Sequence, residues 1–97
     1  MDNDAQMIKS MSNALIDLQV KYRAASVTDR MQIKPALDDL IQKFSQFQIA
    51  LLKEGTITTD ADMAEMANLK KEIDSAANKQ QMIAAIAKTA GFIVKKL

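Results

Sequence analysis

The stretch SAANKQQ, residues 75–81, decides whether the second half of this chain forms one helix or two. Asn78 and Gln81 have the spacing of a helix-capping pair, which favours a turn here. Yet the stretch has no glycine or proline, and the apolar positions keep a helical period through it. A single helix over 60–97 would be roughly 55 Å long, and its uncovered apolar end would need a second subunit. Both interpretations stay open, and the unbroken period favours the long helix.

The rest of the chain has the same helical character. Its 97 residues include only one proline and two glycines, and apolar residues recur every three or four positions, which predicts helices throughout. We expect one domain, 1–97, folded as an all-α antiparallel bundle of three to four helices, in which a long C-terminal helix would complete the core in a dimer. The expected helices cover 4–25, 35–54, 60–77 and 79–96, and the last two are continuous if the long helix forms.

Two features mark the boundaries of the second expected helix. Pro35 is tolerated in the first turn of a helix, where its missing N–H is no loss. We therefore expect a short helical turn over 28–33 and a main helix that begins at Pro35. The segment GTITT, 55–59, is the clearest loop in the chain.

Composition argues against an enzyme. The chain has no histidine and no cysteine, which removes the commonest general base, the commonest metal ligands and the thiol nucleophile. It also lacks the glycine-rich phosphate-binding and nucleophile motifs. We expect no catalytic residues, no cofactor and no metal. The start, MDNDAQMIKS, has no apolar run, so we expect no signal peptide and a cytoplasmic protein.

Charge is distributed unevenly over the second half. Residues 56–77 hold five acidic side chains and two lysines, whereas residues 78–97 hold four lysines and no acid. This asymmetry favours antiparallel pairing, either between two long helices or between the last two short ones. Four lysines without arginine or interleaved aromatic residues are a sparse footprint for a nucleic-acid surface.

The segment AAIAKTAGFIVKKL, 84–97, suggests a core helix or a subunit interface. At 100° per residue, one side of this helix is apolar, while Lys88 and Lys95 lie opposite. The predicted oligomer interface consists of Ile83, Ile86, Ala87, Ala90, Ile93, Val94 and Leu97. An isolated helix of this kind would also bind an anionic membrane, although no tryptophan anchors it.

Phe92 falls between two lysines on the opposite side. A regular helix would expose its ring there, and an aromatic side chain rimmed by charge is typical of a protein contact. The predicted partner-binding surface consists of Lys88, Phe92, Lys95 and Lys96.

These observations favour a non-enzymatic protein–protein interaction module, such as a small helical inhibitor, adaptor or chaperone-like protein. We expect it to form a homodimer and to bind another protein. One alternative is a membrane-surface-active protein that acts through the cationic C-terminal helix. A second alternative is a small nucleic-acid-binding protein.

Overall fold

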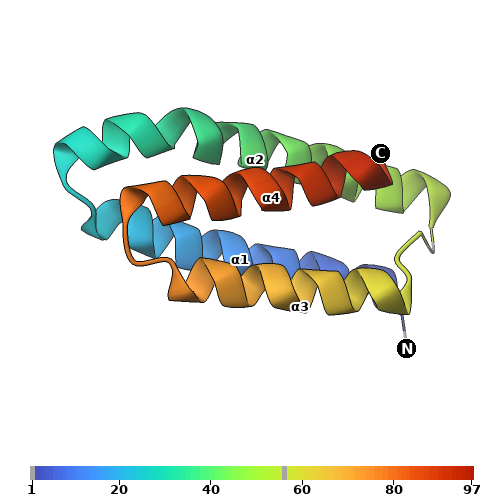
Figure 1. Cartoon of the computed structure of the whole chain (residues 1–97). Helices are drawn as coiled ribbons and strands as arrows, with labels where there is room; N and C mark the ends of the chain where they lie inside the picture. Colours follow the sequence, from blue (N-terminus) through green and yellow to red (C-terminus); the bar gives the residue numbers. More distant parts are fainter. Residues whose placement is uncertain (1, 56) are drawn as a thin grey trace.

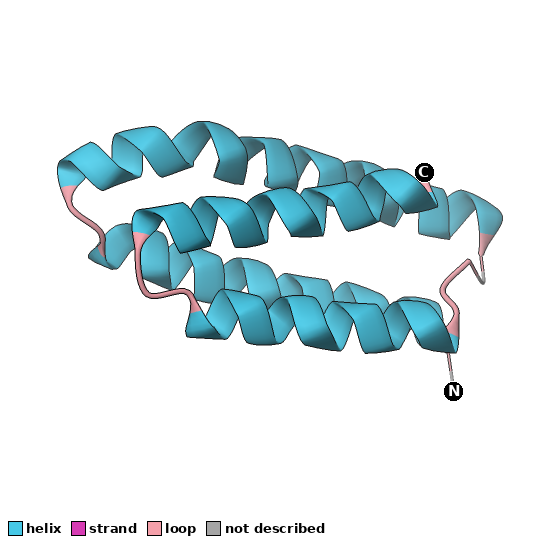
Figure 2. Cartoon of the chain, in the orientation of Figure 1, coloured by secondary structure: helices cyan, strands magenta, loops and turns pink. Residues whose placement is uncertain are grey.

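The computed structural model describes residues 2–55 and 57–97, so Thr56 of the predicted GTITT loop lies outside them. These residues form the four helices α1 (Asn3–Ala24), α2 (Val27–Glu54), α3 (Asp60–Ser75) and α4 (Lys79–Lys96), without a strand among them. Short loops join the helices (Figure 2). The predicted all-α bundle is therefore confirmed, and none of the helices described is long and apolar enough to cross a membrane.

The start of each helix is set by a side chain that accepts a backbone hydrogen bond. Asp2, Ser26, Thr59 and Asn78 occupy the four N-cap positions, each in an extended conformation. Thr59 also forms a capping box, because the Asp62 carboxylate accepts from the Thr59 N–H at 3.0 Å. Such caps satisfy amides that a helix leaves without an internal partner.

The favoured long helix over 60–97 is wrong, because the chain turns at residues 76–78 between α3 and α4. Two hydrogen bonds stabilise this turn, which contains neither glycine nor proline. The Gln81 N–H donates to Asn78 Oδ1 at 2.9 Å, and the Ala77 N–H donates to Gln81 Oε1 at 2.7 Å. Lys21 Nζ donates to the Ala76 carbonyl at 3.0 Å and so satisfies an acceptor at the end of α3. The turn lets both apolar faces find partners within one chain.

The expected start of the second helix at Pro35 is also wrong. The helix begins at Val27 and runs through Pro35 to Glu54, so Pro35 lies in its interior. A proline there leaves the carbonyl four residues earlier, at Met31, without its helical donor. Pro35 and Met31 are both exposed, Met31 by 72%, so this gap in the hydrogen-bond ladder lies on the side that water can reach.

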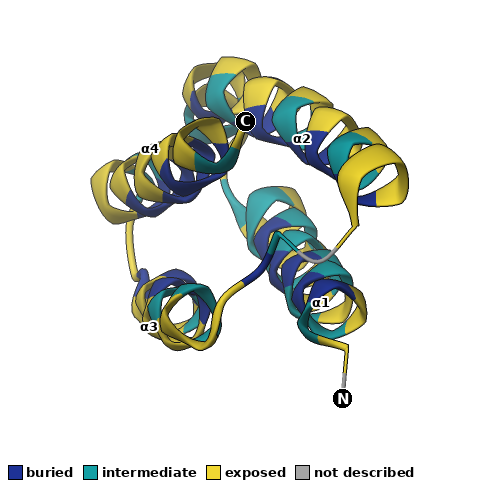
Figure 3. Ribbon diagram, turned by 90° about the vertical axis from the view of Figure 1, so that its right-hand side faces the viewer, coloured by how far each residue is buried: buried dark blue, intermediate teal, exposed yellow. Residues whose placement is uncertain are grey.

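Consecutive helices alternate in direction, but the chain does not visit them in ring order (Figures 1 and 3). Around the bundle, α1 lies beside α2 and α3, while α4 lies beside the same two helices and packs most extensively with α2. The parallel helices α2 and α4 are therefore neighbours. The α2–α3 connection crosses the end of the bundle diagonally (Figure 3).

A carboxylate from α1 holds this crossing loop. Asp4 is buried, and its Oδ1 accepts from the N–H groups of Ile57 and Thr58 at 3.1 and 2.9 Å. Asn3 Nδ2 donates to the Thr58 carbonyl at 3.3 Å and to Asp60 Oδ1 at 2.9 Å. The first turn of α1 thus supplies partners for a backbone segment that has no secondary structure of its own.

All four helices contribute to one core, which Figure 3 shows as the inward-facing side of every ribbon. Phe47, Phe92 and Met7 are the largest of its fully buried side chains. The exposed surface of the chain is 5725 Å², close to the roughly 5,500 Å² that the size scaling gives for a folded monomer of this mass. One chain therefore covers its own core.

Candidate interaction surface on the fourth helix

Phe92 is buried, not exposed. Only 2% of the residue is accessible to solvent, so the prediction that its ring stands on the surface is wrong. It lies within one helical turn of Lys88 and Lys95, whose ammonium groups reach α3, and its ring therefore enters the core on the α3 side. Because α4 packs against two helices, its buried sector is wider than the apolar side expected from the sequence.

The three lysines of the predicted partner-binding surface make ion pairs with acidic side chains of α3. Lys88 Nζ lies 3.2 Å from Glu72, and Lys95 Nζ lies 3.3 Å from Glu65. Lys96 Nζ lies 2.6 Å from Asp62. The structure thus brings these lysines to one edge of α4 but does not join them to an exposed ring. The predicted antiparallel pairing of the last two short helices accounts for the uneven charge.

The Lys96–Asp62 pair is the most enclosed of the three, with side chains only 21% and 14% exposed. Burial alone would raise the pKa of the Asp62 carboxyl. Hydrogen bonds from Lys96 and from Thr59 outweigh burial and hold this pKa below its ordinary value of 3.8. Asp62 therefore serves both as the third residue of the α3 capping box and as the counter-charge for the end of α4.

The residues of the predicted oligomer interface fall on two different sides. Ile86, Ala90 and Ile93 are buried in the core of the single chain, as the core interpretation expects, so they do not lie at a subunit interface. Ile83 is half-buried and packs against the core. The remaining members stay on the surface: Ala87, Val94 and Leu97.

The surface of α4 carries a continuous uncharged stripe. We define the α4 face as five exposed residues that recur at alternating steps of four and three: Gln80, Ala84, Ala87, Gly91 and Val94. This spacing places them on one side of the helix, over much of its roughly 27 Å length. The spacing of small residues in the sequence is the signal for this stripe, although Ala84 and Gly91 are not part of the predicted oligomer interface.

The other helices present charge to solvent. Exposed charged residues include Lys9 and Arg23 on α1, Asp38 and Lys53 on α2, and Lys71 and Asp74 on α3. On α4 the two exposed lysines, Lys88 and Lys95, both lie at the edge that faces α3. Exposed apolar residues also occur on these helices, among them Val20 on α1 and Leu52 on α2, so the α4 face is distinguished by its small side chains.

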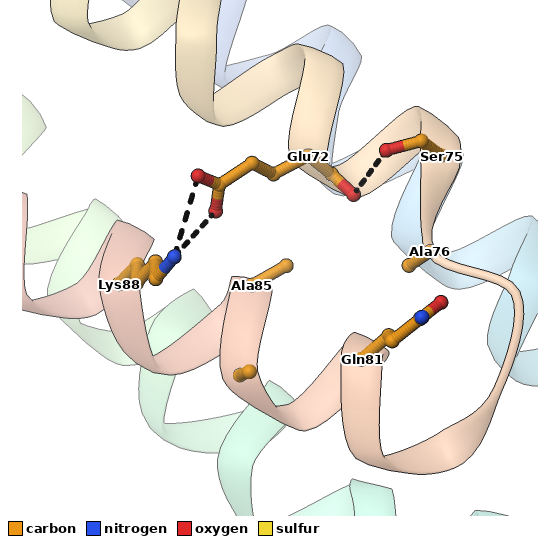
Figure 4. A pocket seen from close by; sticks show the side chains of 7 residues that line it. Glu72, Ser75, Ala76, Gln81, Ala85 and Lys88 are labelled. Atoms are coloured by element: carbon orange, nitrogen blue, oxygen red, sulfur yellow. Dashed lines mark hydrogen bonds and ion pairs between the residues drawn. The ribbon is translucent and has the colours of Figure 1, made fainter.

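A shallow cleft adjoins the α4 face where the end of α3 meets the start of α4 (Figure 4). Its volume is about 240 Å³, and its lining consists of Glu72, Ser75, Ala76, Gln81, Ala84, Ala85 and Lys88. Figure 4 shows Glu72 and Lys88 pointing toward each other beside the small side chains of Ala76 and Ala85. The Ser75 hydroxyl is bonded within α3 and Gln81 is used by the turn, so the cleft offers mainly a small apolar hollow.

Within residues 2–55 and 57–97, no group of three or more acidic side chains is placed to hold a metal ion. Known protein families, curated proteins and solved structures give no match to this chain. The chemistry of the surface is thus the basis for a functional proposal.

Proposed function

We propose that the protein is a non-enzymatic protein-binding module and that the α4 face is its docking surface. The observation that carries this proposal is the stripe of exposed, uncharged residues from Gln80 to Val94. A continuous apolar surface on a small protein commonly marks a site of contact with another protein. An inhibitor, an adaptor or a small chaperone would each use such a surface. The cytoplasmic location and the homodimer expected from the sequence stay predictions.

The surroundings of the stripe suit a protein partner. Small side chains let the backbone of another helix come close, and the adjoining cleft leaves room for one protruding apolar side chain of that partner. The exposed pair Lys88–Glu72 supplies both signs of charge at the rim. An uncharged centre with a polar rim is the usual organisation of a protein interface.

The membrane alternative has less support. The apolar residues that would enter a lipid surface, Ile86, Ala90 and Ile93, are buried in the core, and Lys88 and Lys95 are paired with α3. Membrane binding through α4 would require this helix to leave the bundle. The nucleic-acid alternative meets the same obstacle, because paired lysines attract phosphate less strongly than free ones.

Site-specific photo-crosslinking in the host cell tests the proposal. A photoreactive phenylalanine analogue replaces Ala87 at the centre of the α4 face, and in a control it replaces Ala67, an exposed alanine of α3. We expect a discrete protein adduct from position 87 that is missing from position 67, with its identity read by mass spectrometry. Equal adducts at both positions, or none at position 87, would contradict a docking role for this face.

A further inference from the structure

We propose that the end of the bundle at which α2 and α4 begin binds a small zwitterion, an α-amino acid with an apolar side chain. The site is a cleft of about 390 Å³, which lies within the size range of small-molecule sites. It is independent of the docking role of the α4 face. Three features support the assignment: charges of both signs without a counter-charge, their separation across the cleft, and an apolar floor.

The cleft opens where the ends of all four helices meet. The α1–α2 and α3–α4 connections both lie at this end of the bundle (Figure 1). Lys21 reaches the cleft from α1, Asp29 from the start of α2, and Asn78 and Lys79 from the start of α4. The fold thus gathers charged side chains that are far apart in the sequence.

Two lysines of the cleft lack an acidic partner. Residues 2–55 and 57–97 contain five half-buried lysines, and three of them, Lys43, Lys70 and Lys96, form ion pairs with acidic side chains. The other two, Lys21 and Lys79, both line the cleft. A partly buried charge loses hydration, and without a partner nothing compensates for that loss.

The same holds for one carboxylate. Of the half-buried acidic residues in the described part of the chain, Asp17, Asp62 and Glu65 pair with lysines. The remaining one is Asp29, which also lines the cleft. Arg30, the next residue, is the one other half-buried charged residue described that has no ion pair, and it lies outside the cleft. The cleft therefore holds three of the four such charges, and they are of both signs.

The opposite charges are separated across the cleft. Asp29 on α2 and Lys79 on α4 also line a second hollow of about 320 Å³ beside it, yet they are too far apart to pair. In the proposed complex the ligand ammonium contacts Asp29, and the ligand carboxylate contacts Lys79 and Lys21. Lys21 Nζ donates to the Ala76 carbonyl at 3.0 Å, which holds it beside the turn and leaves further N–H donors for the ligand.

Lys79 has no structural reason within α4. It is the first residue of the helix, where the helix dipole disfavours a cation. The first turn of α4 also has no acidic residue that would offset this charge. A contact with an anionic group accounts for a lysine at this position.

The floor of the cleft is apolar. Ile33 and Met82 line it, and both belong to the buried core. The other lining residues are alanines of the two connections. This floor suits the side chain of an apolar amino acid and leaves its charged groups at the opening.

Three related probes separate the charges of the ligand. Leucine carries both charges, isocaproate is leucine without the ammonium, and isoamylamine is leucine without the carboxylate. In two-dimensional NMR of the isotope-labelled chain, we expect leucine to shift the amide signals of Asn78 and Lys79 saturably, with a dissociation constant of about 1 mM or below. The other two probes should bind at least about tenfold more weakly, because each leaves a charge of the cleft without its partner.

Two substitutions assign the roles of the charges, after thermal unfolding has shown that each variant is folded. Lys79→Met should weaken leucine binding at least about tenfold and no longer distinguish leucine from isoamylamine. Asp29→Asn should weaken it similarly and no longer distinguish leucine from isocaproate. The control Lys71→Met removes an exposed lysine of α3 outside the cleft and should bind leucine like the natural chain.

Three results would overturn the proposal. One is the absence of saturable shifts at Asn78 and Lys79 with both leucine and methionine up to about 10 mM. Another is isocaproate binding to the natural chain as tightly as leucine, which would make the cleft a site for simple anions. The third is a loss of leucine binding in Lys71→Met equal to that in Lys79→Met, which would assign the effect to overall charge.

Discussion

Phe92 is one of the largest buried side chains of the bundle, and it reaches the core between two lysine side chains. Removing a buried phenyl ring leaves a cavity that the surrounding helices fill only in part. We expect Phe92→Ala to lower the free energy of unfolding by about 3–5 kcal/mol, as measured by urea denaturation at a concentration where the chain is monomeric.

Leu52→Ala is the matched control for this substitution. Leu52 is 85% exposed, so its truncation should change the free energy of unfolding by no more than about 0.5 kcal/mol. Equal effects of the two substitutions would mean that the ring at position 92 contributes no more than a surface residue.

Residue type alone does not place Phe92 correctly. The apolar repeats of α1 and α2 reach the core, as Leu18, Ile33 and Phe47 show. On α4 the lysines lie beside the core and not opposite it, since they follow the acids of α3. The direction of an amphipathic helix therefore depends on its neighbours as well as on its own pattern.

At the scale of helices, the ends of α3 and α4 are joined by the enclosed pair of Asp62 and Lys96. The lowered pKa of Asp62 means that the folded chain favours the charged carboxylate. This stabilisation is present above the ordinary value of 3.8 and is lost as the pH falls through the lower folded value. Protonation of Asp62 removes the charge that pairs with Lys96, so acid should weaken the α3–α4 contact.

Asp62→Asn removes the negative charge but keeps the capping hydrogen bond, because the amide oxygen still accepts from the Thr59 N–H. At pH 7 we expect this variant to be less stable than the natural chain by about 1 kcal/mol. Thermal unfolding of both chains at stepwise lower pH should show the difference shrinking below 3.8. A difference that stays constant into strong acid would mean that the carboxylate charge contributes nothing.

Helix boundaries were predictable where the chain signals them chemically. Thr59, Asp62 and Gly55 mark the start of α3 and the end of α2, and Gly55 has the positive φ of 62° that favours glycine. The turn at 76–78 uses amide side chains alone, so its pattern is compatible with a helix that continues. At Pro35 the sequence predicts a helix start that the structure does not have, because a solvent-facing site accommodates a residue that is ordinarily absent from a helix interior.

At the scale of the whole molecule, the order of helices around the bundle was beyond the sequence. The apolar residues of α2, α3 and α4 recur with the same period, so the sequence allows any of these helices to pack against any other. The diagonal α2–α3 crossing places α2 beside α4 (Figure 3). What holds that crossing is Asp4, whose carboxylate accepts from the amides of Ile57 and Thr58, 53 and 54 residues further along the chain.

Loss of the Asp4 carboxylate should therefore release the crossing loop. We expect Asp4→Ala to lower the free energy of unfolding by roughly 2–4 kcal/mol, because two backbone donors lose a charged acceptor in a buried site. Asp4→Asn keeps an acceptor oxygen, so its loss should be smaller, about 1 kcal/mol. Urea denaturation measures both losses.

Hydrogen exchange shows whether the loss arises at the crossing. In Asp4→Ala the amides of Ile57 and Thr58 should exchange faster than in the natural chain, since exchange there follows local opening. Asp2→Ala is the control, because it removes the neighbouring carboxylate that caps α1 at a similar place but leaves the two loop amides bonded. If Ile57 and Thr58 stay protected in Asp4→Ala, the carboxylate does not anchor the crossing, and packing of Thr58 against the end of the bundle must hold α2 beside α4.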